Sequence, residues 1–218
     1  MKALYLLVEG QTEEEFVKET LRPYLIAKGL SDVRPFILNT RVGYKGGFVN
    51  YDHLKRDAIK LVRQRDDVIL TTLIDYFRIP HNIPNYNRCS VIPNLDERVQ
   101  CLEKAMYDDM QNDRFIPYIQ KHEFEALLFC SNSGFEKYFG HFASDTQNVI
   151  DQYPNPEDIN DHPNTAPSKR LLNLIPEYDK VLFGNVLAQD VGIELMLEKC
   201  PRFRDWMDTL LSAVSRDY

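Results

Sequence analysis

Two long apolar or β-branched runs, at residues 4–8 and 68–74, mark the centre of the predicted sheet. Runs without alternating polar positions are typical of parallel strands that are covered on both faces. Each run ends directly at an acidic residue, Glu9 in the first case and Asp75 in the second. Because the carboxyl ends of parallel strands form the ligand-binding edge of an open α/β sheet, we expect both carboxylates there.

Helical periodicity and turn residues separate these runs. Thr12 followed three positions later by Glu15 predicts a capping box, and therefore a helix over residues 12–28 that Gly29 ends. A strand predicted at residues 114–120 runs into Glu123 and Glu125 and brings a third set of acids to the same edge. The other predicted elements of this half are an edge strand at 33–38 containing Pro35 and helices at 51–64, 95–111 and 126–129.

The pattern predicts an α/β core at residues 1–130, with a mainly parallel sheet between helices and an irregular excursion at 76–93. Residues 131–218 should form a mainly helical extension that is packed on this core and is not an independent domain. Residues 131–153 are predicted to be partly helical and are followed by a loop at 154–167. Three further helices are predicted at 168–175, with Ser168 as cap, at 181–198 and at 202–214.

Composition narrows the class of protein. The 218 residues are 44% hydrophobic and 27% charged, with a formal charge of −7. This charge argues against a domain that grips nucleic acid with its own basic surface, but not against a nuclease whose partner supplies that surface. No run is long enough to span a bilayer and no signal-peptide pattern is present, so we expect a cytoplasmic protein. The cysteines, which lack CxxC spacing and are expected to be reduced thiols, are Cys89, Cys101, Cys130 and Cys200.

The acids at the predicted strand ends are candidate metal ligands. They are Glu9, Asp75, Glu123 and Glu125, with Glu13 in the first turn of the following helix. Mg²⁺ or Mn²⁺ prefers oxygen ligands and takes a few carboxylates plus water. Two such ions would serve an in-line phosphoryl displacement.

Each acid also has an ordinary structural explanation. Glu13 favours the positive end of a helix dipole, and Asp75 can cap the next turn. Glu123 and Glu125 would diverge on one helix and can reach one site only if a helix begins near Phe124, so Glu123 is the better candidate for a direct ligand. The joint pattern of three strands ending in acids favours a metal site.

Basic residues near this edge are candidates for stabilising negative charge in a transition state. Lys169 and Arg170 follow the predicted loop, and Lys180 follows Asp179. Each is also explained as a solvated surface charge. Lys169 is the better candidate because it lies at a capped helix start. His122 is more simply a structural residue than a base or ligand.

The order of these motifs resembles TOPRIM-like nucleases, including those of the overcoming-lysogenization-defect type. More closely, it is similar to a bacterial family of domains of unknown function, number 4276. That resemblance implies a three-layer TOPRIM-like fold and Mg²⁺-dependent phosphodiester cleavage by Glu9, Glu13, Asp75 and Glu123, with Lys169 stabilising charge. It also implies a separately encoded ABC- or AAA-type ATPase partner in a defence-related or mobile locus. The motifs that carry the resemblance are VEG at 8–10 with Thr12-Glu13, Gly46-Gly47, IDY at 74–76, HEFEALLF at 122–129, TAPSKR at 165–170 and CPRFRDW at 200–206.

One position departs from the TOPRIM pattern. Phe77 stands where a DxD motif would place its second aspartate. The site would then bind one ion weakly, recruit Glu123 or Glu125, or have lost catalysis. Two alternatives therefore stand beside the nuclease: a catalytically degenerate module that binds a partner protein, and a phosphohydrolase that acts on small molecules at the same metal edge.

Overall fold

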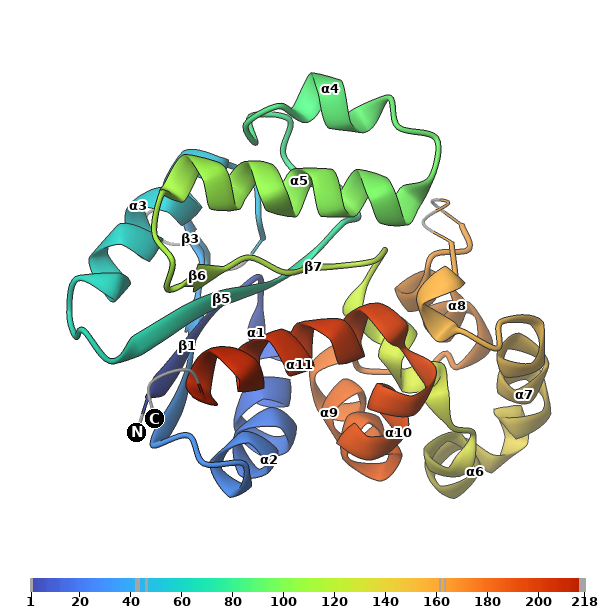
Figure 1. The fold of residues 1–218 in the computed structure, drawn as a ribbon. Coiled ribbons are helices and arrows are strands. Elements are labelled where there is room, and N and C mark those ends of the chain that lie inside the picture. Colours follow the sequence, from blue (N-terminus) through green and yellow to red (C-terminus); the bar gives the residue numbers. More distant parts are fainter. Residues whose placement is uncertain (1, 42–43, 46, 161, 163, 216–218) are drawn as a thin grey trace.

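The computed structural model describes residues 2–41, 44–45, 47–160, 162 and 164–215 (Figure 1). Its main sheet has five strands, all paired in parallel. The strands, in spatial order, are β2 (Asp32–Ile37), β1 (Ala3–Val8), β5 (Val68–Asp75) and, side by side along β5, β6 (Phe115–Ile116) and β7 (Ile119–Gln120). The parallel central sheet is confirmed, with β2 at an edge as Pro35 predicted.

Every residue of β1 is buried, because both faces of the sheet are covered by helices. Leu4 and Leu6 pack on one side, while Tyr5 and Leu7 pack on the other. The first side carries α1 (Gln11–Phe16), a π-helical stretch (Val17–Leu21) and α2 (Arg22–Ala27); the second carries α3 (Tyr51–Val62) and α5 (Leu95–Met110). The result is the expected three-layer α/β arrangement.

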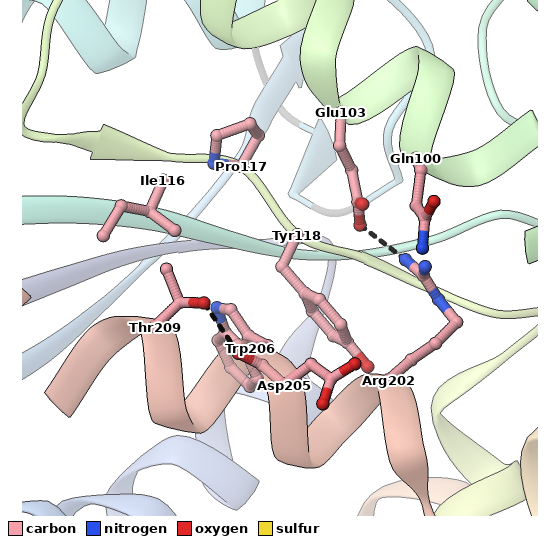
Figure 2. Close-up of a pocket in the computed structure, with 9 residues that line it drawn as sticks. All are labelled: Gln100, Glu103, Ile116, Pro117, Tyr118, Arg202, Asp205, Trp206 and Thr209. Carbon is pink, nitrogen blue, oxygen red and sulfur yellow. Dashed lines mark hydrogen bonds and ion pairs between the residues drawn. The ribbon is translucent and has the colours of Figure 1, made fainter. Parts of the chain in front are cut away.

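The second half of the chain is helical and joins the first apolar layer. Its last helix lies along the sheet, where Trp206 stacks on Tyr118 with ring centroids 4.3 Å apart and donates a 2.9 Å hydrogen bond to Thr71 Oγ1. A cavity of about 190 Å³ lies at this seam, between α5, β6 and the last helix (Figure 2). The elements are η2 (Phe124–Cys130), α6 (Ser133–Phe139), η3 (Gly140–Phe142), α7 (Ala143–Gln152), η4 (Pro156–Asp158), α8 (Pro167–Leu174), α9 (Lys180–Val191), α10 (Ile193–Lys199) and α11 (Pro201–Ser215).

Two predicted elements are divided, and the predicted irregular segment contains a helix. The strand at 114–120 is divided at Pro117, which has no N–H for the ladder, and the Thr72 hydroxyl instead bridges to the backbone of Tyr118. The helix predicted at 181–198 is divided by Gly192, whose φ of 73° ends α9 before α10 begins. The excursion at 76–93 contains a short helix, α4 (Tyr86–Ser90).

The first helix ends as predicted but starts differently. Gly29, at φ 103°, follows the last turn and confirms the predicted stop. The capping box is wrong: α1 begins at Gln11 with Gly10 as its cap, so Thr12 lies inside the first turn. Glu15 instead pairs with Lys18 on the outer face, at 3.0 Å.

The expectation of four reduced thiols is also wrong. Cys89 and Cys101 form a disulfide that joins α4 to α5. Cys130 and Cys200 are free and buried, with their sulfur atoms 3.4 Å apart. The spacing of Cys89 and Cys101 in the sequence does not indicate a disulfide, because only the path of the excursion brings α4 back onto α5.

A second, two-stranded sheet, β3 (Asn39–Arg41) and β4 (Tyr44–Lys45), precedes the Gly46-Gly47 pair, of which Gly46 lies outside the described residues. Among the described helices, none is both long and apolar enough to cross a membrane.

Candidate functional site

The carboxyl ends of β1, β5 and β7 meet at one edge of the sheet, and two hydrogen bonds join the residues that follow them. The backbone N–H of Asp75 donates to Glu9 Oε2 at 3.2 Å. The backbone N–H of Phe124 donates to Asp75 Oδ1 at 2.9 Å. Three segments that are distant in sequence therefore converge on Glu9 and Asp75, as the strand pattern predicted.

Glu13 lies one helical turn after Glu9 and faces the same edge. Its side chain is buried, with 4% of the residue exposed. Gly10 leaves room for this carboxylate, since a Cβ atom at position 10 would lie only 3.2 Å from Glu13 Oε2. The neighbouring Glu14 points away and pairs with Lys18.

Glu125 enters the same cluster because η2 begins at Phe124, the condition under which both glutamates could reach one site. Glu125 is fully buried, and its Oε1 lies 2.8 Å from Lys180 Nζ. Oε2 is buried and has no hydrogen-bond partner among the described residues.

Lys180, rather than Lys169, is the cation at the acidic edge. It is the first residue of α9, after Asp179, whose carboxylate accepts the N–H of Leu182 at 2.8 Å. Lys169 is exposed in the first turn of α8, and within the described residues no ion pair joins it to the acids. Lys180 is exposed, with 44% of its side chain accessible, as expected for a surface charge. Its contact with Glu125 could not be predicted, because nothing local in the sequence shows that α9 packs against α1.

Glu123 has a different set of partners. Its Oε2 accepts the backbone N–H of Ser168 at 2.8 Å, and its Oε1 accepts the Ser168 hydroxyl at 3.0 Å. The Glu123 carboxylate therefore accepts a backbone N–H group in the first turn of α8, which would otherwise lack a hydrogen-bond partner within the helix. The prediction that Ser168 itself caps this helix is wrong, since Ala166 occupies the cap position.

Burial raises the pKa of the carboxyl groups of Glu9, Glu13, Asp75 and Glu125, and repulsion between neighbouring acids raises it further. For Asp75 the second cause is the charge of Glu9, followed by that of Glu13. Burial would lower the pKa of Lys180, but the charges of Glu125, Asp75 and Glu13 outweigh it and the pKa is raised. The charge of Glu123 also raises the pKa of Glu9 and Glu125, so five acids and one lysine leave an excess of negative charge that protons or a cation must neutralise.

The donor chemistry fits a hard divalent cation. All candidate ligands are carboxylate oxygens, and the unpartnered Oε2 of Glu125 has a free lone pair at the edge. Among the described residues, no three acidic, histidine or cysteine side chains are already spaced as a coordination shell. Binding would therefore require side-chain rotation.

Phe77 leaves the edge immediately after Asp75. Its backbone N–H donates to the carbonyl oxygen of His122 at 2.9 Å, and its ring is half-buried. The ring supplies no ligand where a DxD motif would supply one, so an ion here would depend on the other acids of the edge: Glu9, Glu13, Asp75, Glu123 and Glu125.

The chain has a TOPRIM-like α/β fold. The chain is similar to the C-terminal region of the Xanthomonas campestris pv. campestris OLD protein, with a TM-score of 0.50, 16% identity, and coverage of 99% of this chain and 95% of that one. It also aligns with the C-terminal region of the Burkholderia pseudomallei OLD protein, with a TM-score of 0.49, 18% identity, and coverage of 97% and 98%.

The sequence matches the family described as Domain of unknown function (DUF4276) over residues 8–211, and the chain belongs to that family. Among curated proteins, none matches it.

Proposed function

We propose that this chain is a nuclease that hydrolyses phosphodiester bonds with Mg²⁺ or Mn²⁺ held at the acidic edge. The supporting observation is the convergence of Glu9, Asp75, Glu13 and Glu125 around Lys180 at the carboxyl ends of parallel strands. The resemblance of the sequence motifs to TOPRIM-like nucleases implies chemistry at this edge, and the fold is similar to the C-terminal region of the Xanthomonas campestris pv. campestris OLD protein.

In this proposal Glu9, Asp75 and Glu125 hold the ion, and Glu13 accepts a hydrogen bond from the attacking water and orients it. A bound ion supplies Lewis-acid polarisation of the phosphoryl group. Lys180 stabilises the negative charge that develops on the phosphoryl oxygens. Glu123 keeps α8 beside the site through Ser168, and its remaining lone pairs are available to the ion.

Nucleic acid is the proposed substrate, and the ATPase partner expected from the resemblance is proposed to supply most of the grip. The formal charge of −7 supports this division of labour, because an acidic protein gains little from the counterion release that drives binding to nucleic acid.

A cleavage assay tests the proposal. Wild-type protein should nick plasmid and cut oligonucleotides with Mg²⁺ or Mn²⁺, and Glu9→Gln or Asp75→Asn should reduce the rate by about 100-fold or more. Glu14→Gln is the matched control, because Glu14 is adjacent to Glu13 but pairs outward with Lys18. Cutting that persists in the Glu9 and Asp75 variants contradicts the assignment.

The same preparation separates the alternatives. Turnover of nucleotides without cutting of DNA or RNA would identify a small-molecule phosphohydrolase. The partner-binding module is favoured by Phe77, which removes one expected ligand. Such a module would neither cut nucleic acid nor turn over nucleotides, and calorimetry would detect no divalent-ion binding.

A further inference from the structure

Two segments that carry basic residues contact residues 122–123 beside the acidic edge. The N–H of Phe77 donates to the His122 carbonyl at 2.9 Å. The N–H of Ser168 donates to the Glu123 carboxylate at 2.8 Å. These contacts place residues 77–78 and 168–170 beside the same stretch of backbone, although about ninety positions separate them in sequence.

Each flank carries an arginine over an aromatic ring. The Arg78 guanidinium lies 5.1 Å from the centre of the Phe77 ring, and that of Arg170 lies 5.2 Å from the Tyr153 ring. Arg170 is also held by the carbonyl oxygen of Thr165 at 2.7 Å. Arginine planes and aromatic rings together make surfaces on which unpaired bases stack.

Two exposed charges on these flanks have no ion-pair partner among the described residues. Arg78 and Lys169 are both exposed, and neither forms an ion pair with any residue that the structure describes. The excursion at 76–93 contains Arg78, His81 and Arg88 and no acidic residue, in a chain whose formal charge is −7. Arg78, three residues after Asp75, therefore lies in a segment of positive charge that begins at the acidic edge.

The excursion is held in place and carries backbone strain at this point. Arg78 has a φ of 61°, which a residue with a side chain rarely adopts. Asn82 accepts the N–H of Tyr51 at 2.9 Å, and Arg98 donates to the Tyr76 hydroxyl at 3.1 Å. Such strain persists only where surrounding contacts over-determine it, and it is common at binding sites.

We infer that Phe77, Arg78, Lys169 and Arg170 form a basic track that binds a single strand of DNA or RNA across the acidic edge. A base stacks on Phe77 and the Arg78 plane, and phosphates contact Arg78 and Lys169. A paired duplex keeps its base faces inside the stack, so only an unpaired strand can use the ring. The inference rests on the proposed function, because it places the substrate strand over the same site, and it gives Phe77 a role in place of the missing aspartate.

Fluorescence anisotropy with the full chain tests the track in EDTA, where no cutting occurs. The probes are labelled dT and U oligonucleotides and a duplex of equal length. Wild type should bind both single strands more tightly than the duplex. Phe77→Leu, which keeps an apolar side chain, should weaken single-strand binding about tenfold. Arg78→Asn and Lys169→Gln should each lower the salt slope of binding by about 0.7. Asparagine is chosen because it tolerates φ > 0.

Arg63→Gln is the matched control, because Arg63 is exposed at the end of α3, near the opposite edge of the sheet. It should bind like wild type, and circular dichroism should show the same folded content in all variants. Wild-type affinity in folded Phe77→Leu and Arg78→Asn proteins, or a preference for duplex, overturns the track. Strand binding that depends on these residues without any cutting in Mg²⁺ or Mn²⁺ supports the track and contradicts the nuclease, so the two failures are distinct.

Discussion

At the scale of single residues, the two lysines near the acidic edge are expected to have different roles. Both lysines are exposed, but Lys180 Nζ lies 2.8 Å from Glu125 Oε1, whereas Lys169 forms no ion pair with a described acid. Lys180→Met should lower kcat about 100-fold with little change in KM, because its charge acts on the transition state. Lys169→Met should raise KM with kcat nearly unchanged. Steady-state kinetics on a single-stranded oligonucleotide measure both, and equal losses of kcat would contradict the distinction.

Part of this site could be predicted from the sequence alone. Glu9 and Asp75 could be placed together because unbroken apolar runs identify parallel strands, and parallel strands fix which ends coincide. The sequence could not show that Lys180, and not Lys169, lies beside the acids, because the position of Lys180 depends on α9 packing against α1. Similarly, the sequence favours Glu123 over Glu125 as a direct ligand. The extended backbone at Glu123 sends it to Ser168 while the turn that follows buries Glu125, and neither orientation has a local sequence signal.

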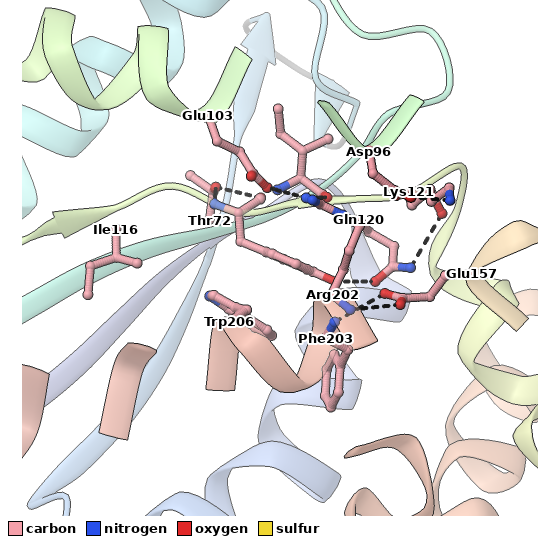
Figure 3. Close-up of polar contacts among 12 residues, drawn as sticks. Thr72, Asp96, Glu103, Ile116, Gln120, Lys121, Glu157, Arg202, Phe203 and Trp206 are labelled. Carbon is pink, nitrogen blue, oxygen red and sulfur yellow. Dashed lines mark hydrogen bonds and ion pairs between the residues drawn. The ribbon is translucent and has the colours of Figure 1, made fainter. Parts of the chain in front are cut away.

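At the scale of elements, α11 is attached to the rest of the fold by a buried acid. Glu157 is fully buried and accepts the backbone N–H groups of Arg202 at 2.9 Å and Phe203 at 3.1 Å (Figure 3). It therefore caps the start of α11. The nearby Lys121 is also buried and joins Asp96 to Asp158, which fixes the path after β7. These polar contacts connect the segment after β7, the η4 region and the start of α11.

This cap predicts a pH dependence of stability. Burial raises the pKa of Glu157 from its ordinary 4.5 to about 7. The folded protein therefore holds the proton more tightly than the unfolded chain, and the free energy of unfolding falls as pH rises from about 4.5 to 7. Urea denaturation across this range should show a decrease of up to about 3 kcal/mol from this group. Glu157→Gln should reduce the slope of the free energy of unfolding against pH by the equivalent of about one proton. An unchanged slope would contradict the proposed effect of Glu157 on stability.

At the scale of the whole molecule, the second half of the chain should not unfold separately. Residues of the sheet, such as Leu4 and Leu6, share one apolar layer with Phe135, Leu187 and Trp206 of the later helices. A separate unfolding of 131–215 would expose one face of the sheet to water, at the full cost of its apolar surface. The chain is therefore expected to unfold in a single cooperative step, which is what makes its melting temperature a usable measure of ion binding.

That measure gives the sharpest test of the acidic edge. Because Glu9, Glu13, Asp75 and Glu125 have raised pKa values, protons compete with a divalent ion at low pH. At pH 8, Mn²⁺ at about 100 times its Kd should stabilise the fold by about 2.7 kcal/mol and raise Tm by roughly 5–10 °C. At pH 5 the shift should be much smaller. Asp75→Asn should lose the pH 8 shift while Glu14→Gln keeps it, since Glu14 pairs with Lys18 outside the cluster. A shift equal at both pH values, or one that survives Asp75→Asn, would mean that the ion binds elsewhere.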